Sequence, residues 1–305
     1  MNQTELLEVI AKAARTEAWD LNLSNKGLLS LPAQIGQLNN LKRLSLFGNQ
    51  LTSLPPEIAL LANLKTLSVT VDQLASLPPE IYQLSNLTTL YIEGNSLRRL
   101  PPEIYELNNL TKLYLFADSL RQLPPEISQL QNLMQLHVHC THLTALPVEI
   151  GQLTSLKKLF LVGGQLSSLP LEIGQLTNLR TFSLDNNKAL ASLPPEIGQL
   201  TNLTELSLYN NALTSLPPEF AQLTKLKSLY LSGNALVSLQ PEIGKLSNLQ
   251  TLDLRFNGLT SLPPEIARLS KLRVFLVGNN PLPEELLQTD PRTPKAMFDC
   301  LRAVA

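Results

Sequence analysis

The stretch LHVHCTHL, residues 136–143, contains all three histidines of the chain and one of its two cysteines. Imidazole and thiolate groups at such short spacing are the ligands that zinc prefers in proteins. His137 and His139 are two residues apart, so on a β-strand both side chains would point to the same face. The elements that position these side chains decide between a metal site, a contact surface and a structural role.

Composition excludes several classes of function. The 305 residues include 24 Lys and Arg against 25 Asp and Glu, so no overall field attracts nucleic acid or anionic lipid. The N-terminal residues lack the basic start and apolar block of a secretory signal, and no apolar run approaches the length of a membrane span. Cys140 and Cys300 lie far apart, which is typical of a reducing compartment. We therefore expect a cytoplasmic protein without membrane insertion.

The chain repeats itself about every 23 residues. One unit reads LKRLSLFGNQLTSLPPEIALLAN, with Leu at positions 1, 4, 6, 11 and 14, Asn at position 9 and Pro at positions 15 and 16. The step is 24 residues only between Leu179 and Leu203, and a degenerate first unit begins at Ala18. The other units begin at Leu41, Leu64, Leu87, Leu110, Leu133, Leu156, Leu179, Leu203, Leu226, Leu249 and Leu272.

The repeat resembles the leucine-rich repeat family over roughly residues 18–283. The family motif L-x-x-L-x-L-x-x-N-x-L is intact from Leu87 and again from Leu203 and Leu226. The LPPEIxxL segment found in many of the units is similar to the cytoplasmic Ras-group subclass of bacterial type, which includes the repeat arms of Roco GTPases. The resemblance implies an α/β solenoid: a horseshoe with a parallel β-sheet on its concave face and short helices or 3-10 turns on its convex face.

Elementary chemistry predicts the same elements. Residues 43–47 alternate between polar and apolar types, which indicates a short strand that buries one face. The residue before Pro55 must be extended, and Pro56 suits the first turn of a short helix. One such unit cannot bury its own apolar face, but stacked units form a continuous core.

Both ends of the stack need a cover. We expect residues 1–17 to form an N-terminal capping helix with Thr4 as its cap, and about 12 units of 23–24 residues to fill 18–283. Residues 284–305 are expected to form C-terminal capping helices, with Met297, Phe298, Leu301 and Val304 on one face.

The Asn at position 9 is expected to satisfy backbone groups in the turn after each strand. Asp72, Asp118, Thr141 and Gly164 replace it, so we expect the ladder of asparagines to be weakest between residues 118 and 164. The asparagines expected to keep this role are Asn49, Asn95, Asn187, Asn211, Asn234, Asn257 and Asn280.

Positions 5 and 7 of each unit point away from the core and are free to carry function. Four consecutive units place a ring at position 5, where the units at both flanks carry Ser. Rings on neighbouring strands can pack in a file, and exposed apolar patches often mark contact sites. The predicted partner-binding patch comprises Tyr91, Glu93, Tyr114, Phe116, His137, His139, Lys158, Phe160 and Val162. The alternative is that strand surfaces simply favour aromatic residues.

A smaller cluster, predicted as a secondary contact site, comprises Tyr209, Tyr230, Arg255 and Phe256. Nucleic acid is not expected on the same face, because acidic residues interrupt it and no continuous basic groove is present. These acidic residues are Asp20, Glu93, Asp185, Glu205 and Asp253.

His137, His139 and His142 form the alternative metal site. Few carboxylates lie nearby to orient ligating imidazoles, so we expect no metal and no cofactor. The imidazoles are interpreted instead as members of the contact patch, where their charge would make binding depend on pH. Cys300 has no histidine after residue 142 to act as its base, so a catalytic cysteine is not expected either.

These observations favour a non-catalytic module that binds a protein through its concave face. The alternative suggested by the resemblance is the N-terminal sensing arm of a larger Roco-type GTPase. No G-x-x-x-x-G-K-[ST] motif occurs in the sequence, so any phosphate loop would have to lie outside it.

Overall fold

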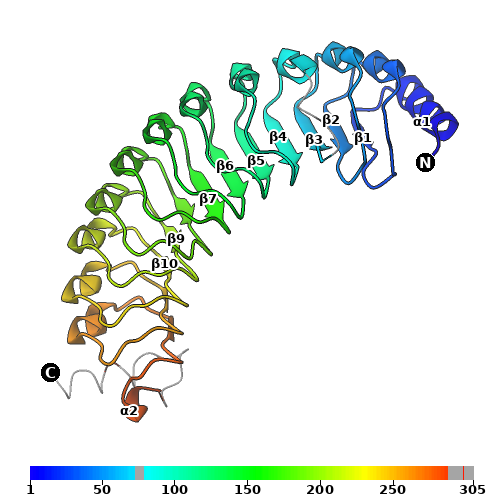
Figure 1. Ribbon diagram of the computed structural model, residues 1–305. Helices are drawn as coiled ribbons and strands as arrows, with labels where there is room; N and C mark the ends of the chain where they lie inside the picture. The colour runs from blue at the N-terminus through cyan, green and yellow to red at the C-terminus, as the bar shows by residue number, and fades with distance from the viewer. Residues whose placement is uncertain (73–78, 288–297, 299–305) are drawn as a thin grey trace. The chain divides into compact units, whose positions relative to one another are not determined.

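The computed structural model describes residues 1–72, 79–287 and 298. The chain divides into two compact units, Met1–His142 and Leu143–Ala305, each built from short parallel strands that alternate with 3-10 helices (Figure 1).

The first unit begins with the helix α1 (Gln3–Arg15), and its described residues, 1–72 and 79–142, form six strands. The strands are paired in parallel and in chain order. They are β1 (Asp20–Asn22), β2 (Arg43–Leu46), β3 (Thr66–Thr70), β4 (Thr89–Glu93), β5 (Lys112–Phe116) and β6 (Gln135–His139). The 3-10 helices between them are η1 (Ala33–Gln37), η2 (Pro56–Leu60), η3 (Pro79–Gln83), η4 (Pro102–Glu106) and η5 (Pro125–Gln129).

The second unit repeats this plan, again with parallel neighbours in chain order. Its strands are β7 (Lys158–Val162), β8 (Thr181–Ser183), β9 (Glu205–Ser207), β10 (Ser228–Tyr230), β11 (Thr251–Asp253) and β12 (Val274–Leu276). Its helices are η6 (Val148–Gln152), η7 (Leu171–Gln175), η8 (Pro195–Gln199), η9 (Pro218–Gln222), η10 (Pro241–Lys245), η11 (Pro264–Arg268) and α2 (Glu284–Leu287).

The core follows from the register of the strands. Each position of one repeat pairs with the same position of the next, as Leu44 with Leu67 and Leu67 with Leu90, and these leucines are fully buried. The isoleucine of the 3-10 helices, such as Ile58 and Ile104, closes the core from the other side. The predicted class, a leucine-rich repeat solenoid with a parallel sheet opposite short 3-10 helices, is confirmed.

Two kinds of turn follow the strands. In the first kind, position 8 has a positive φ, as at Gly48 (68°) and Asn186 (62°), and this ends the strand. The Asn at position 9 then lies inside: Asn49 donates to the carbonyls of Leu23 and Leu46, both at 2.9 Å, and accepts from the amide of Leu28 at 3.0 Å. Asn187 makes the same contacts, donating to the carbonyls of Leu161 and Leu184, whereas the turn at Gly163 has the same positive φ but carries Gly164 in place of the asparagine.

The second kind of turn follows β3 to β6. Here the strand alternation continues to position 8, which is buried and carries Val71, Gly94, Ala117 or Cys140. The amide of Val71 donates to Glu93 O and that of Ala117 to His139 O, whereas the amide of Gly48 after β2 donates to the Thr70 hydroxyl. Strands β3 to β6 have five residues, as does β7, which is followed by the first kind of turn at Gly163 (φ 82°); the other strands have three or four.

The expectation for Asn95 was therefore wrong. Its side chain is exposed, because Gly94 occupies the inward position and the strand runs on past the point where the ladder asparagine would enter. Asp72 was expected to interrupt the ladder, and because Asn95 does not restore it, the break continues from Asp72 to Gly164.

The N-terminal helix begins at Gln3, two residues earlier than Thr4 would require as a cap. Asn2 is the N-cap: its side chain accepts from the amide of Glu5 at 2.9 Å, and the Glu5 carboxylate accepts from the amide of Asn2 at 3.0 Å. Leu6 and Ile10 of this helix are buried. Of the residues expected on the C-terminal capping face, Phe298 is described and buried, while Met297, Leu301 and Val304 lie outside the described residues.

The two kinds of turn predict different costs for the same substitution at the same motif position. Asn49→Ala should lower the free energy of unfolding by about 1–3 kcal/mol, because it leaves buried carbonyl and amide groups without partners. Asn95→Ala should change it by less than about 0.5 kcal/mol, since that side chain is exposed. Urea denaturation followed by circular dichroism measures both. Equal losses for the two variants would contradict the assignment of the turns.

Candidate contact surface

The predicted patch residues of the first unit form two adjacent columns on the outer face of its sheet. Position 5 of β4, β5 and β6 carries Tyr91, Tyr114 and His137, which pair in register. Position 7 of the same strands carries Glu93, Phe116 and His139. Because these strands have five residues, position 7 still obeys the strand alternation and faces the same side as position 5. None of the six side chains belongs to the core, and His139 is exposed.

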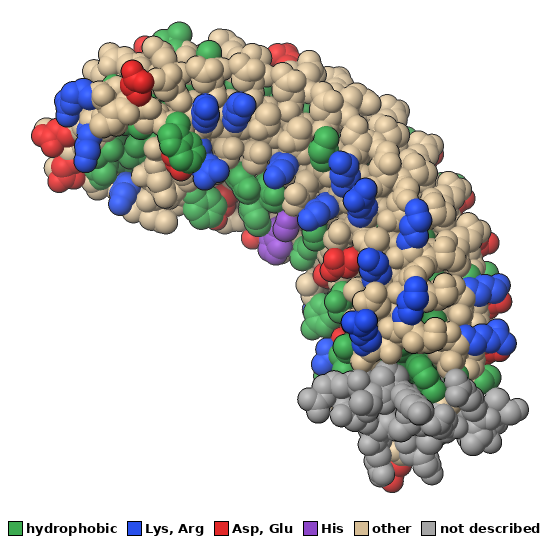
Figure 2. All heavy atoms as spheres, turned by 180° about the vertical axis from the view of Figure 1, so that it is seen from behind, with side chains coloured by type: hydrophobic (Ala, Val, Ile, Leu, Met, Phe, Trp, Pro, Cys, Tyr) green, Lys and Arg blue, Asp and Glu red, His purple; other side chains and the backbone are tan. Residues whose placement is uncertain are grey.

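The rings of these columns contact one another. Tyr91 and Tyr114 are stacked, with centroids 4.1 Å apart and an angle of 7° between the ring planes. Phe116 lies 5.5 Å from His137 and 6.3 Å from His139, with tilted rings. Aromatic pairs at these distances stabilise one another and hold a defined surface. Figure 2 shows histidine side chains beside hydrophobic ones on the exposed surface.

Polar groups at this surface are held by their neighbours. Burial and the hydrogen bond with Tyr91 raise the pKa of Tyr114 to about 12, so its hydroxyl is neutral at physiological pH. Glu93 accepts a hydrogen bond of 2.8 Å from the Thr70 hydroxyl, which in turn accepts from the amide of Gly48 at 2.7 Å. Thr70 was not among the predicted site residues. Thr70 occupies position 7 of the preceding repeat and pairs with Glu93 across the two strands. This position would have indicated that Thr70 belongs to the site.

His137 differs from a solvent-exposed imidazole. Burial, and then the nearby His139, lower the pKa of His137 below its ordinary value of 6.5. The ring is therefore neutral at pH 7 and presents an apolar, hydrogen-bonding surface rather than a charge.

The third histidine and the cysteine lie in the turn and not on the contact surface. His142 Nδ1 is 2.7 Å from the carbonyl oxygen of Asp118, and the Thr141 hydroxyl contacts the same imidazole nitrogen at 3.0 Å. Cys140 is buried, with its thiol directed at the carbonyl of Leu120. Across residues 1–72, 79–287 and 298, no group of three His, Cys, Asp or Glu side chains is arranged to hold a metal ion. The alternative site of His137, His139 and His142 is not assembled, because a carbonyl engages His142 elsewhere.

The remaining patch residues belong to β7 in the second unit. Lys158 is exposed, while Phe160 and Val162 are partly exposed on the outer face of the strand. Phe160 pairs in register with Ser183 of β8, so the ring column ends there within this unit.

The predicted secondary cluster is also found at the surface of the second unit. Tyr209 and Phe256 are exposed to 48% and 57%, and Tyr230 is partly exposed. Arg255 forms a two-pronged ion pair with Asp253, with contacts of 2.9 and 2.7 Å, and this hydrogen bonding raises the pKa of the guanidinium. The ion pair fixes Arg255 as a rim group beside the two exposed rings.

Comparison with known families assigns the chain to one of them. A family model described as leucine-rich repeat region matches residues 92–189. A second model, described as leucine rich repeat, matches residues 62–120, 177–236 and 224–282, and a third of the same description matches residues 40–61. The chain belongs to the leucine-rich repeat family, as the sequence resemblance predicted. Its members generally act as protein-interaction modules, and the matches indicate no catalytic domain.

Solved structures with this fold come from bacteria, plants and Drosophila. A leucine-rich repeat protein of Leptospira interrogans is 35% identical, with 96% of each chain covered and a TM-score of 0.48. The plant peptide hormone receptor RGFR1, in complex with RGF2, is 30% identical over 86% of this chain and 48% of its own, with a TM-score of 0.63. This chain thus spans about half the length of that receptor.

An internalin of Listeria monocytogenes is 22% identical over 91% of this chain and 81% of its own, with a TM-score of 0.74, and shares the fold. A comparison with curated proteins found no match. None of the helices in the described part of the chain has the length and hydropathy of a transmembrane span.

The environment of His137 predicts its titration. Its NMR-detected pKa should lie below 6.5 and rise in His139→Gln, because that variant removes a neighbouring positive charge. Since the unfolded chain binds the proton more readily, His137 should reduce stability as pH falls below about 6.5 and leave it unaffected above that value. A pKa at or above 6.5 in the native protein would show that the ring is better solvated than the structure indicates.

Proposed function

We propose that the first unit binds a protein partner through the outer face of β4, β5 and β6, without catalysis and without a cofactor. The anchors are Tyr91, Tyr114, Phe116 and His137, and Glu93 and His139 form the polar margin. This is the face predicted to be concave from the sequence.

The observation that carries this proposal is the stacked and tilted ring cluster at positions that the core does not use. The buried leucines of the same strands account for the stability of the repeats, so the rings are not needed for packing. Tyr and Phe clusters with a polar margin have the composition of binding hot spots. The neutral His137 adds to this apolar area, because at pH 7 it carries no charge that would have to be desolvated.

Related proteins support a protein as the partner. The plant receptor RGFR1 was solved in complex with RGF2, and this chain is 30% identical to it over most of the present sequence. The balanced charge of the chain argues against nucleic acid, whose binding depends on phosphate neutralisation.

The second unit offers two further surfaces, which we propose as additional contacts of the same kind. One is formed by Lys158, Phe160 and Val162 on β7, and the secondary one by Tyr209, Tyr230, Arg255 and Phe256. The exposed rings supply apolar area, and the ion pair with Asp253 holds the Arg255 guanidinium in a fixed orientation.

A second candidate is the sensing arm of a larger Roco-type GTPase. The repeated LPPEIxxL half-units favour it, and they also favour a cytoplasmic location. In that protein the sheet surface would serve as the sensor for a protein signal.

The contact surface is tested by a double substitution. In Tyr114→Ala, Phe116→Ala, the ring cluster is removed while the leucine core remains, so circular dichroism should show a folded protein. Partner capture from the source cell, quantified by mass spectrometry, should fall at least tenfold, because loss of two hot-spot rings costs about 2 kcal/mol or more.

Phe47→Ala is the matched control for that experiment. Phe47 is also an exposed ring at position 7, with 39% exposure, but it lies on the first unit outside the cluster. It should leave capture unchanged. Retention of every partner by the folded double variant would show that binding uses another surface, and loss only in a Tyr209→Ala, Phe256→Ala variant would assign it to the second unit.

The GTPase candidate is tested by the coding sequence after Ala305. A phosphate-loop motif G-x-x-x-x-G-K-[ST] in the same reading frame, with nucleotide binding by the longer protein, is the expected result. An immediate stop codon would eliminate this candidate.

A further inference from the structure

The 3-10 helices approach one another through a column of small residues. The residue after the helix isoleucine or phenylalanine is Gly or Ala in most repeats. A Cβ placed on Gly36 would lie 2.7 Å from the carbonyl oxygen of Glu57, and one on Gly151 would lie 2.5 Å from that of Glu172. A large side chain at this position must therefore separate the helices. The small residues are Gly36, Ala59, Gly151, Gly174, Gly198, Ala221, Gly244 and Ala267.

Tyr82 in η3 and Tyr105 in η4 break this pattern. Both rings are buried, Tyr82 to 7% exposure and Tyr105 completely. The helices η4 and η5 accordingly pack less closely than η6 and η7, where Gly151 provides the contact. Tyr105 thus acts as a wedge between two successive repeats.

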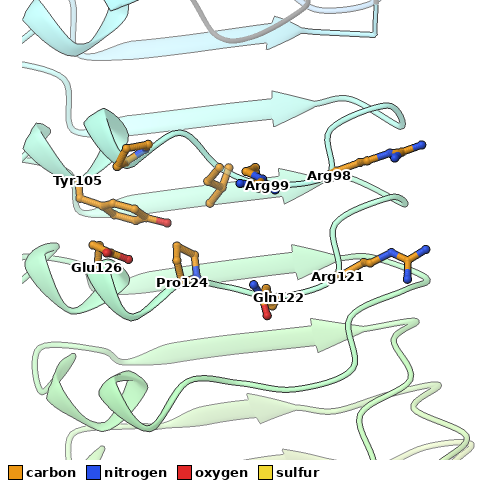
Figure 3. A pocket seen from close by; sticks show the side chains of 9 residues that line it. Arg98, Arg99, Tyr105, Arg121, Gln122, Pro124 and Glu126 are labelled. Atoms are coloured by element: carbon orange, nitrogen blue, oxygen red, sulfur yellow. The ribbon is translucent and has the colours of Figure 1, made fainter.

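A cleft of about 590 Å³ lies beside this wedge, between the segments that lead into η4 and η5 (Figure 3). Its apolar walls include Leu100, Pro102 and Pro124. This volume is in the range of small-molecule sites in proteins.

Three arginines contribute to the cleft, and the repeat pattern does not require them. Arg98 and Arg99 occupy positions 12 and 13 of one repeat, and Arg121 occupies position 12 of the next. Position 13 of that second repeat is Gln122. All other complete repeats carry Ser, Thr, Ala, Val or Leu at positions 12 and 13. Figure 3 shows Arg98 and Arg121 extending in the same direction from equivalent loops. Guanidinium groups bind carboxylates and phosphates through two parallel hydrogen bonds.

The opposite end of the cleft has a different character. The Tyr105 hydroxyl is buried and has no hydrogen-bond partner among the described residues. Figure 3 shows it directed from η4 toward the space between the two segments, with Glu126 nearby. Burial, and then the charge of Glu126, raise the pKa of Tyr105, so the phenol is a neutral donor. Buried hydroxyls in folded proteins normally have a partner, so the Tyr105 hydroxyl can donate to a polar group that enters the cleft.

We propose that this cleft binds a small molecule with a carboxylate or phosphate at one end and an amine or hydroxyl at the other. Arg98, Arg99 and Arg121 bind the anion, and the polar group reaches the Tyr105 hydroxyl and the Glu126 carboxylate. The flanking repeats lack basic residues at positions 12 and 13, so no continuous basic path exists for a polyanion such as nucleic acid. The ring of Tyr105 is fully covered, so binding includes a small outward shift of the side chains above its hydroxyl.

Isothermal titration with three probes tests the proposal: inorganic phosphate, L-glutamate and phosphoethanolamine. A probe with both end groups, L-glutamate or phosphoethanolamine, should bind more tightly than phosphate. Arg98→Ala and Arg121→Ala should each weaken its binding about tenfold, as expected for lost charged hydrogen bonds. Arg273→Ala, which removes an exposed arginine of the second unit, is the matched control and should have no effect. Binding by none of the probes, or binding unaffected by both arginine variants, would overturn the proposal.

Tyr105→Phe separates the role of the hydroxyl from that of the ring. It should raise the Tm of the ligand-free protein, because an unpartnered buried hydroxyl is removed while the wedge stays. It should also lower the affinity for the probe several-fold, which would not be expected if the hydroxyl had only a structural role. A lower Tm, or unchanged probe binding, would overturn the assignment of the hydroxyl. Partner capture by the Tyr114→Ala, Phe116→Ala variant is a separate measurement, so failure of either proposal is distinguishable from failure of the other.

Discussion

The structure depends on one constraint: a single repeat cannot bury its own apolar face, so every repeat needs its neighbours in the same register. The strand pairs keep this register within each unit, with Leu44, Leu67 and Leu90 in one buried column. Each position of the motif therefore becomes a column of equivalent residues spaced by about 4.8 Å. A residue that departs from its column changes the surface or the packing only locally, and its effect can be traced to a position in the motif.

The repeated pattern made much of the fold predictable. The spacing of Leu and Pro gave the strands, the short helices opposite them and the buried columns, because these follow from alternation and from the geometry around proline. The outward placement of Tyr91, Tyr114 and His137 followed from the same alternation. These properties recur in every repeat, so a wrong assignment in one repeat is corrected by comparison with the others.

Features confined to a few repeats were harder to predict. The motif gave Asn95 a place in the ladder, but Gly94 takes the inward position instead, because the backbone there stays extended. The second kind of turn carries a small or apolar residue at position 8, namely Val71, Ala117 or Cys140. This signal can be used only once the two kinds of turn have been distinguished in the structure. The cap of α1 was misassigned because Asn2 and Glu5 satisfy each other's amides, and Thr4 lies between them. The cleft beside Tyr105 was not predicted, since it depends on the packing of two repeats and not on either alone.

The departures from the repeat pattern fall in the same part of the first unit. The turns after β3 to β6 extend the strands, the rings of Tyr91, Tyr114 and Phe116 occupy the lengthened surface, and Tyr105 opens the opposite side beside three arginines. Stacking requires none of these changes, and the repeats from Leu179 onward do without them. Some are costly, because a buried hydroxyl without a partner and a partly buried imidazole both oppose folding. Residues that oppose folding, at positions where the regular motif has a more stabilising residue, are the physical argument behind both proposals for these repeats.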